Sequence, residues 1–215
     1  MASNAPPPEP PRIAVFAKAP VAGTVKTRLV PLLGHERAAR LHAGLVHRAL
    51  ATALAAGASE VQLWCAPDAT DAFFAECGRT HGVVLKAQIG NDLGARMAHA
   101  FEALLADGRP AILIGSDAPA LTAAAIGAAG RALATHDAVF TPAEDGGYAL
   151  VGLARPAPSL FAGVAWGSAT VMAETRVRLA AARLRWHEAP RTWDVDRPED
   201  YERLVREGLL PEVLA

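Results

Sequence analysis

The 215-residue sequence predicts a single α/β domain in which helices cover both faces of a mostly parallel central sheet. Short β-rich apolar runs alternate four times with helical patterns, which is typical of strand–helix–strand units. Runs such as 12–17 and 111–114 are apolar at almost every position, as expected for strands that are buried on both faces. Hydrophobic residues make up 52% of the chain, and no linker or repeat divides it. We expect the domain to span 12–206, between a disordered proline-rich tail at 1–11 and a C-terminal tail at 207–215.

The first four elements are two strands and two helices. A strand at 12–17 ends at a Lys-Ala-Pro turn signal. Apolar residues then recur at helical spacing over 36–56, and Gly57 provides a stop. A second apolar run at 61–65 predicts a strand, and 68–77 predicts a helix.

The middle of the chain continues this alternation. A strand at 83–88 precedes a helix at 91–105, whose leucine, methionine and phenylalanine residues form one apolar stripe. A fourth strand at 111–114 and an alanine-rich helix at 122–134 follow, and a fifth strand is expected at 138–141.

The alternation breaks after residue 142. A strand at 148–152 is flanked by glycines, and a helix is expected at 168–182. A strand candidate at 183–187 and a short helix at 198–207 complete the chain. We therefore expect the last third to add antiparallel or irregular pieces to the sheet.

Charge and hydropathy exclude several classes of protein. The 21 basic and 22 acidic residues give a net charge of −1, and no Lys/Arg run occurs. Nucleic-acid binding and membrane-surface binding both favour a basic excess, so neither partner is expected. No apolar stretch is long enough to span a membrane, and the first twelve residues have no signal-peptide pattern. We expect a soluble cytoplasmic protein; the sequence does not fix its oligomeric state, although an alanine-rich helix face could pair in a homodimer.

Cysteine and histidine residues give no sign of a metal centre of their own. Cys65 and Cys77 lack the spacing of a zinc site and fit buried thiols in a reducing compartment. The spacing of His35, His42 and His47 matches no metal-binding helix motif, so these side chains are expected to face solvent.

The loop after the first strand is the first candidate for ligand binding, because open α/β sheets bind ligands at the carboxyl ends of their strands. Small residues and a glycine let backbone N–H groups approach an anion, and three cations suit a phosphate chain. A solvated surface loop fits the same composition equally well. The candidate nucleotide-binding residues of this loop are Ala17, Lys18, Ala19, Pro20, Gly23, Lys26 and Arg28.

The end of the third strand is a second, weaker candidate for the nucleotide site. Gln88 is placed to hydrogen-bond a base edge, and Gly94 would let a ligand ring lie against the following helix. Arg96 is placed to reach a phosphate. Gly90 begins a segment that is also an ordinary helix start, so helix capping alone explains it as well.

Acidic residues after the fourth strand and near the C-terminus predict a site for Mg²⁺ or Mn²⁺. Asp117 follows a central strand, and hard cations prefer carboxylate oxygens. The alternative is a turn that Asp117 initiates before Pro119. Asp194 is the preferred second ligand and Asp196 a less certain third, because Asp196 and Glu199 have the spacing of a capping box.

The loop after the fifth strand is the candidate for the acceptor substrate. Gly146 and Gly147 permit a sharp turn and a close backbone approach, beside Tyr148. Asp145 would then face an acceptor hydroxyl as a hydrogen-bond partner or base. A plain hairpin turn is an equally good interpretation.

Taken in order, five blocks resemble one bacterial family. They are AKAPVAGTVKTRL (17–29), QIGNDLGARM (88–97), GSDAP (115–119), EDGGYALVGL (144–153) and DVDRPED (194–200). Over roughly residues 12–206 the chain resembles the glycosyltransferase-like proteins of the DUF2064 type. These are similar to the GT-A nucleotide-diphospho-sugar transferase fold and to MobA-like and 2-phospho-lactate guanylyltransferase-like nucleotidyltransferases.

The resemblance implies a GT-A-like domain that binds a nucleotide through Lys18, Gly23, Lys26 and Arg28 and a divalent metal at Asp117. Two positions depart from the family pattern. Thr24 stands where a basic residue is frequent, which weakens the phosphate argument slightly. Trp166-Gly167-Ser168 replaces the usual Trp-Ser-Thr, so the acceptor side, to which we assign Trp166, is less firmly implied.

We therefore expect a metal-dependent transferase that joins a nucleotide-activated donor to a small-molecule acceptor, with Lys26, Asp117 and Asp145 as catalytic residues. The family name favours a glycosyltransferase that uses a nucleotide sugar. The alternative is a nucleotidyltransferase that moves a guanylyl or cytidylyl group from a nucleoside triphosphate. A second alternative is a catalytically idle nucleotide-binding protein.

Overall fold

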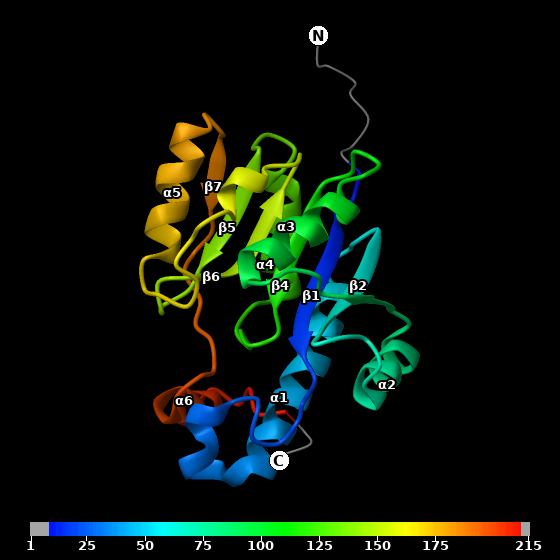
Figure 1. Ribbon diagram of the computed structural model, residues 1–215, viewed down its shortest axis with the longest axis vertical. Coiled ribbons are helices and arrows are strands. Elements are labelled where there is room, and N and C mark those ends of the chain that lie inside the picture. The colour runs from blue at the N-terminus through cyan, green and yellow to red at the C-terminus, as the bar shows by residue number, and fades with distance from the viewer. Residues whose placement is uncertain (1–8, 212–215) are drawn as a thin grey trace.

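The computed structural model describes residues 9–211 as one seven-stranded sheet with helices on both faces (Figure 1). Residues 1–8 and 212–215, which belong to the two expected tails, lie outside the described residues. The sheet order is β3-β2-β1-β4-β6-β5-β7. The strands are β1 (Arg12–Lys18), β2 (Glu60–Ala66), β3 (Val84–Ala87), β4 (Ala111–Gly115), β5 (Ala138–Pro142), β6 (Tyr148–Leu153) and β7 (Trp186–Glu188).

The expected mostly parallel sheet is confirmed. Strands β1 to β4 pair in parallel, and β7 pairs in parallel with β5. Strand β6 runs antiparallel to both of its neighbours, β4 and β5. The tight turn at 143–147 joins β5 directly to β6. Strand β6 is therefore the antiparallel element that was predicted for the last third of the chain.

Short polar side chains begin three of the helices. Asp71 accepts a hydrogen bond from the Phe73 N–H, Asp92 from the Ala95 N–H, and Thr122 from the Ala125 N–H. The helices are α1 (Val30–Leu54), α2 (Ala72–His81), α3 (Leu93–Leu104), α4 (Ala123–Ala132), α5 (Val171–Ala181) and α6 (Pro198–Arg206), with single 3₁₀ turns η1 (Thr27–Leu29) and η2 (Pro158–Leu160).

The alternation of side chains along β1 separates two cores. Ile13 and Val15 pack with α1, α2 and α4 on one face, whereas Ala14 and Phe16 pack with α3, η2 and α5 on the other. A third, smaller cluster joins the start of α1 to α6 beyond the end of the sheet, where Figure 1 shows these two helices together. Most of the candidate site residues lie between this cluster and the carboxyl ends of the strands.

Several element boundaries differ from the expected ones. Helix α1 starts six residues earlier than predicted and bends at Gly34, whose φ is 75°. Helix α2 starts four residues later, because Asp68 accepts hydrogen bonds from Thr70 in a turn before Asp71 caps the helix. Strand β7 is shorter than predicted, because Arg183 adopts φ 52° and interrupts extended backbone.

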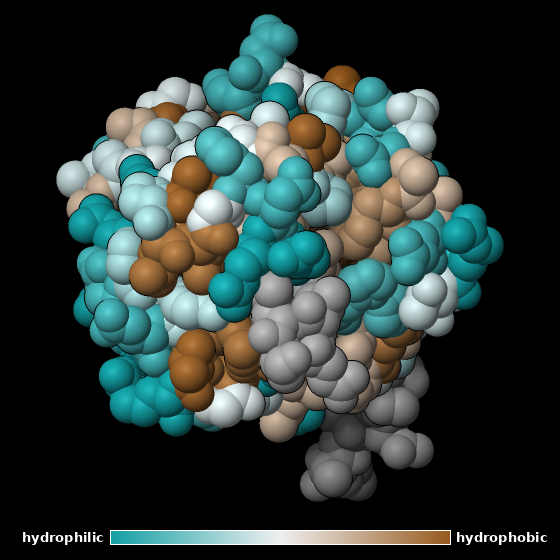
Figure 2. All heavy atoms as spheres, turned by 90° about the horizontal axis from the view of Figure 1, so that it is seen from below, coloured by the Kyte–Doolittle hydropathy of each residue, from teal (hydrophilic) through white to brown (hydrophobic). Residues whose placement is uncertain are grey.

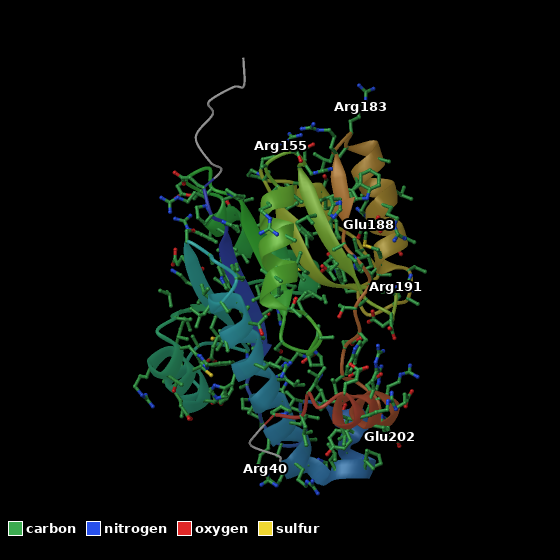
Figure 3. The ribbon with its side chains drawn as sticks, turned by 180° about the vertical axis from the view of Figure 1, so that it is seen from behind. Arg40, Arg155, Arg183, Glu188, Arg191 and Glu202 are labelled. Carbon is green, nitrogen blue, oxygen red and sulfur yellow. The ribbon has the colours of Figure 1, made fainter. Side chains whose placement is uncertain are left out.

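The surface carries mixed side chains. Among residues 9–211, no helix is both long and apolar enough to cross a membrane. Seen from the end that carries α6, Figure 2 shows separate hydrophobic patches among hydrophilic residues. Labelled charged side chains such as Arg155, Arg183 and Glu202 lie at the periphery of the molecule in Figure 3. The alanine-rich α4 packs on the sheet and against α1, so the expected homodimer stays a prediction.

Candidate functional site

The segment between β7 and α6 brings the distant acidic residues together. Thr192 forms a parallel bridge with Ala143 just beyond β5, and the Val195 N–H donates to the Asp117 carbonyl at 2.9 Å. The orange-brown segment in Figure 1 that runs from β7 to α6 is this crossing. Asp194 is therefore placed over the carboxyl ends of β4 and β5, although 77 positions separate it from Asp117.

The half-exposed carboxylate of Asp117 pairs with a buried lysine. The Lys26 Nζ is 2.9 Å from the Asp117 Oδ1 and donates to the Val195 carbonyl at 2.6 Å. Lys26 is 8% exposed and adopts φ 48°, a conformation that is uncommon outside glycine and that turns this side chain inward. Burial raises the pKa of Asp117, but the positive charge of Lys26 and the neighbouring His42 ring outweigh it and hold the pKa well below its usual range.

His42 belongs to this site, so the expectation that it faces solvent is wrong. It is 4% exposed, its Nε2 hydrogen-bonds the Lys18 carbonyl at 2.9 Å, and its Nδ1 is 3.7 Å from the Asp117 Oδ1. The signal was present in the sequence, because His42 falls at helical spacing between the apolar residues Ala38 and Leu45. His42 therefore links the end of β1 to the Asp117 carboxylate.

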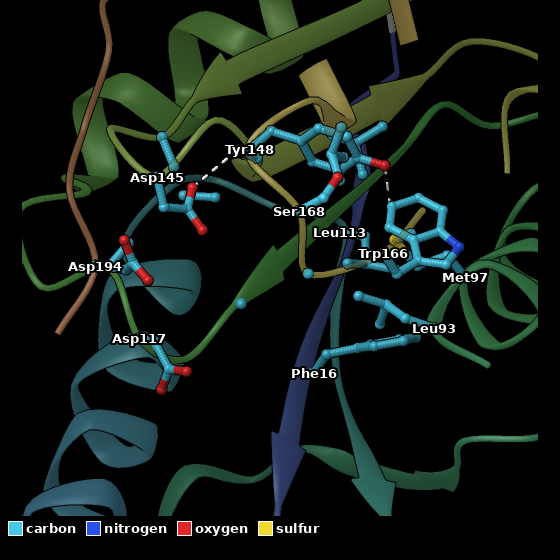
Figure 4. A pocket seen from close by; sticks show the side chains of 18 residues that line it. Phe16, Leu93, Met97, Leu113, Asp117, Asp145, Tyr148, Trp166, Ser168 and Asp194 are labelled. Carbon is cyan, nitrogen blue, oxygen red and sulfur yellow. Dashed lines mark hydrogen bonds between the residues drawn. The ribbon is translucent and has the colours of Figure 1, made fainter. Parts of the chain in front are cut away.

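Three carboxylates share one end of the site, as Figure 4 shows for Asp117, Asp145 and Asp194. Burial raises the pKa of Asp194 to about 6, and the charges of Asp145 and Asp117 add to this shift, while Lys26 opposes it. The Asp145 Oδ1 accepts a hydrogen bond from the Gly147 N–H at 2.8 Å, so Asp145 also stabilises the turn. The hairpin interpretation of this loop and a role at the site are thus compatible.

The acidic residues offer some, but not all, of the donors that a metal ion would need. Within residues 9–211, no three His, Cys, Asp or Glu side chains lie close enough to hold a metal ion by themselves. Asp117 and Asp194 are oxygen donors, and crowding of their charges with that of Asp145 raises the pKa of Asp194. Mg²⁺ typically takes one or two carboxylates together with substrate phosphates, so this donor set fits such an ion.

Two cavities meet at Asp117. The first, which we call the cationic cleft, has a volume of about 600 Å³, and its basic lining residues are Lys18, Lys26, Arg28 and Arg96. The second, which we call the apolar cavity, has a volume of about 290 Å³ and contains Asp145 and Asp194 at one end. Phe16, Leu93, Gly115 and Asp117 line both cavities.

The predicted nucleotide loop divides into residues that line the cationic cleft and residues that support it. Ala17 and the three cations of the loop line the cleft. Ala19 is buried, and its N–H donates to the Ala66 carbonyl. Pro20 and Gly23 line neither cavity, and Gly23 adopts φ 83° in the turn. For these last two residues, nucleotide binding stays a prediction.

At the end of β3, Gln88 and Arg96 line the cationic cleft, but the two glycines do not. A Cβ at Gly94 would lie 2.3 Å from the Phe161 carbonyl oxygen and 2.5 Å from the Trp166 Nε1. Protein therefore occupies the space that the prediction gave to a ligand ring. Gly90 has φ 146° and its carbonyl accepts from the Arg96 Nε, so it serves the turn before α3.

The capping interpretation of Asp196 is wrong. Asp200 accepts hydrogen bonds from the backbone N–H groups of Asp196 and Arg197, so the α6 cap lies one residue later than predicted. The Asp196 side chain instead pairs with Arg28 at the cationic cleft. It faces a different cavity from Asp194, because Asp194 lines the apolar cavity.

The predicted acceptor residues mostly line the apolar cavity. Asp145, Gly147, Tyr148 and Trp166 lie on its wall. Gly146 does not, because a Cβ there would lie 2.1 Å from the Ala169 carbonyl oxygen, which shows that the turn packs directly against the start of α5. Gly146 thus packs against this segment, and its role in acceptor binding stays a prediction.

The sequence did not identify most of the apolar lining. These residues belong to strands and helices and have the ordinary pattern of a core, so nothing in the sequence separated them from it. They are Phe16, Leu93, Met97, Leu113, Val151 and Val171.

Comparisons with known proteins show a family and a shared fold. Residues 49–168 match the family described as "Uncharacterized protein conserved in bacteria (DUF2064)". A proposed nucleotide-diphospho-sugar transferase from Desulfovibrio desulfuricans G20 is 33% identical, with 93% of this chain and 88% of that chain covered and a TM-score of 0.84. No curated protein matched the sequence.

Two more distant structures share the fold. Rv0371C from Mycobacterium tuberculosis H37Rv, in complex with manganese, is 17% identical over 93% of this chain and 99% of that chain, with a TM-score of 0.57. A cytidylyltransferase from Leptospira borgpetersenii serovar Hardjo-bovis is 14% identical over 91% of this chain and 85% of that chain, with a TM-score of 0.58. The nucleotide-diphospho-sugar transferase fold is therefore established for the chain.

Proposed function

The chain belongs to the DUF2064 family of proteins conserved in bacteria, and on that premise we propose that it is a transferase that uses a nucleotide-activated donor and a divalent metal ion. The observation that supports this most is the position of Asp117, on the wall between a cationic cleft and an apolar cavity, with Asp194 beside it. A donor in one cavity and an acceptor in the other would meet at these carboxylates.

The cationic cleft is suited to the nucleotide end of the donor. Lys18, Arg28 and Arg96 offer positive charge to phosphate oxygens. Gln88 is held at the end of β3, where its Nε2 donates to the carbonyls of Ala17 and Trp64. This rigid amide is placed to contact a base.

Asp117 and Asp194 would hold Mg²⁺ or Mn²⁺, with phosphate oxygens as the remaining ligands. Such an ion stabilises the negative charge that develops on a departing diphosphate. Lys26 keeps the Asp117 carboxylate ionised and fixed in position. Asp145, at the exposed end of the three carboxylates, would accept the proton of the acceptor hydroxyl.

Sugar transfer is the first choice of chemistry, and it leaves a nucleoside diphosphate. The 33% identical Desulfovibrio protein is described as a nucleotide-diphospho-sugar transferase, which supports this ranking. Nucleotidyl transfer, which releases pyrophosphate, remains the alternative, because the same phosphate-binding groups serve both reactions.

An activity assay distinguishes the candidates. The full-length protein is incubated with a panel of nucleotide sugars and nucleoside triphosphates, with mixed small-molecule acceptors, in Mn²⁺ and in EDTA. We expect Mn²⁺-dependent release of nucleoside diphosphate. Pyrophosphate release without nucleoside diphosphate would instead establish the nucleotidyltransferase. Tight nucleotide binding without any product would indicate the idle binding protein.

A further inference from the structure

The apolar cavity has two chemically different ends. Asp117, Asp145 and Asp194 lie together at one end, and apolar side chains make up the other, as Figure 4 shows. The apolar end is built from one face of the central strands β1, β4 and β6, from α3 and from the 166–168 loop. Its main residues are Phe16, Leu93, Met97, Leu113, Val151 and Trp166.

Among the residues described, the apolar end offers few hydrogen-bonding groups. The Tyr148 hydroxyl contacts only the Met97 Sδ at 4.0 Å, and a thioether is a weak acceptor. The Trp166 Nε1 is buried without a hydrogen-bond partner, but it lies against Gly94 rather than over the cavity. Ser168 also lines the cavity, but its hydroxyl is already paired with the Thr170 hydroxyl at 2.9 Å. A ligand in this end would therefore find the Tyr148 hydroxyl and otherwise mainly hydrocarbon and sulfur.

This lining is unsuited to a sugar ring. Aromatic faces can stack on sugars, but each buried sugar hydroxyl needs a hydrogen-bond partner, and leaving one unpaired opposes binding. An apolar group gains from the same burial, because it is removed from water. A volume of about 290 Å³ accommodates a small ring system or a short alkyl chain.

We propose that the acceptor is a hydrophobic alcohol or phenol, whose apolar body fills this end and whose hydroxyl lies among the three carboxylates. This proposal rests on the transferase function above. The acceptor oxygen forms a bond to C1 of the donor sugar, while the bond from C1 to the diphosphate oxygen breaks. Its electron pair leaves on the nucleoside diphosphate, and the hydroxyl proton passes to Asp145.

Leu93 allows a test that spares the core. It is 44% exposed and is the first residue of α3, where an acidic residue is favourable for the helix. Leu93→Asp places a charge at the mouth of the cavity. Ile89→Asp is the matched control, because Ile89 is 57% exposed and lines neither cavity.

The binding of 2-naphthol without nucleotide is measured by calorimetry for wild-type protein and both variants, and glucose serves as the polar probe. Circular dichroism verifies that each variant is folded. We expect equal affinity for wild type and Ile89→Asp, at least tenfold weaker binding to Leu93→Asp, and no displacement by glucose. Ser168→Phe, which fills the cavity from its loop, should also weaken binding. Displacement by glucose, or unchanged affinity in both cavity variants, would overturn the proposal.

Turnover separates this inference from the proposed function. Diphosphate release with sugar acceptors but not with 2-naphthol or hexanol would leave the transferase function standing and refute the hydrophobic acceptor. Cavity-dependent 2-naphthol binding without release from any nucleotide would support the apolar site and refute the transferase.

Discussion

The two cavities that meet at Asp117 are built from different parts of the fold. The cationic cleft is lined by the β1 loop, the end of β3 and the start of α3, and its charged side chains lie on loops and helix ends. The apolar cavity is lined by faces of β4, β6 and α3 and by the 166–168 loop. The parallel strands thus place cationic side chains around one cavity, and the antiparallel strand β6 adds apolar surface to the other.

Removing the group that both cavities share should have the largest effect. We expect Asp117→Ala to reduce metal-dependent product release by about 10³-fold, or about 4 kcal/mol in transition-state stabilisation. It should also lower the free energy of unfolding by about 1–2 kcal/mol, because the buried Lys26 loses its anion, an effect reduced by the 44% exposure of the Asp117 side chain. Product assays and urea denaturation measure the two effects. Asp68→Ala, on an exposed turn, is the control, and retention of a tenth of the activity would contradict the role of Asp117.

A substitution at Asp194 tests the second proposed metal ligand. Asp194→Asn should weaken Mn²⁺ affinity in the presence of nucleotide by about 10–100-fold. The rise in melting temperature that Mn²⁺ and nucleotide together produce should therefore be smaller than in the wild type. Thermal unfolding with a titration of Mn²⁺ provides the measurement. An unchanged Mn²⁺-dependent rise would show that Asp117 and Asp194 do not share an ion.

The pH dependence follows from the raised pKa of Asp194. Its pKa of about 6 exceeds the unfolded value of 3.8, so ionising Asp194 costs free energy in the folded protein without metal. The protonated form of Asp194 therefore contributes a stability that is fully present below about pH 4 and is lost as the pH rises through 6. Asp194→Asn removes this cost, so it should change the free energy of unfolding more favourably at pH 8 than at pH 4. The difference between the two effects should be no more than about 3 kcal/mol. Denaturation at both pH values tests this, and an equal effect at both would refute the shift.

Mn²⁺ binding should strengthen as the pH rises, whereas the stability contributed by protonated Asp194 decreases. A cation requires the ionised carboxylate, so Mn²⁺ affinity should fall as the pH drops below 6, with release of about one proton per ion bound. Calorimetry in buffers of different ionisation enthalpy measures this proton, which Asp194→Asn should abolish.

These carboxylates also show what the sequence could and could not predict. The mostly parallel sheet and the meeting of Asp117 with Asp194 were predicted from apolar runs and from the rule that ligands bind at the carboxyl ends of strands. The inward turn of Lys26 was not predicted, because φ 48° depends on tertiary contacts with Asp117 and Val195. The spacing of the histidines matches no metal-binding motif, whereas the position of His42 between Ala38 and Leu45 on the buried stripe of α1 indicates its burial.

The apolar cavity was the least predictable feature. A side chain that lines an empty space and one that fills a core have the same hydrophobic pattern, and only the arrangement of α3, β6 and the 166–168 loop distinguishes them. Gly94 illustrates the difficulty. A glycine near a helix start signals a close approach, but the sequence does not say whether a ligand or Trp166 makes that approach.

Gly94→Ala should therefore alter the apolar cavity and leave the cationic cleft unchanged. The new Cβ would press on the Phe161 carbonyl and the Trp166 indole, so we expect a loss of about 1–3 kcal/mol in the free energy of unfolding. Affinity for 2-naphthol should change several-fold, whereas nucleotide affinity should stay within twofold. Gly78→Ala, in α2, is the control, because its Cβ would meet Leu85 at an ordinary 3.5 Å and should stabilise the helix slightly. Unchanged 2-naphthol binding would show that Gly94 does not shape the apolar cavity.

The smallest effect should come from Asp196, which faces the cationic cleft without joining the proposed metal pair. Asp196→Asn frees Arg28 from an exposed ion pair, and such pairs contribute little to stability. Freed Arg28 can approach a phosphate, so nucleotide affinity should rise by no more than about threefold at low salt, and the gain should vanish at high salt. Mn²⁺ affinity should change much less than in Asp194→Asn. Arg28→Gln is the companion variant and should lower nucleotide affinity without changing 2-naphthol binding. If Asp196→Asn instead weakens Mn²⁺ binding as strongly as Asp194→Asn, the metal ion contacts carboxylates of both cavities. That result would contradict the proposed separation of a charged donor site from an apolar acceptor site.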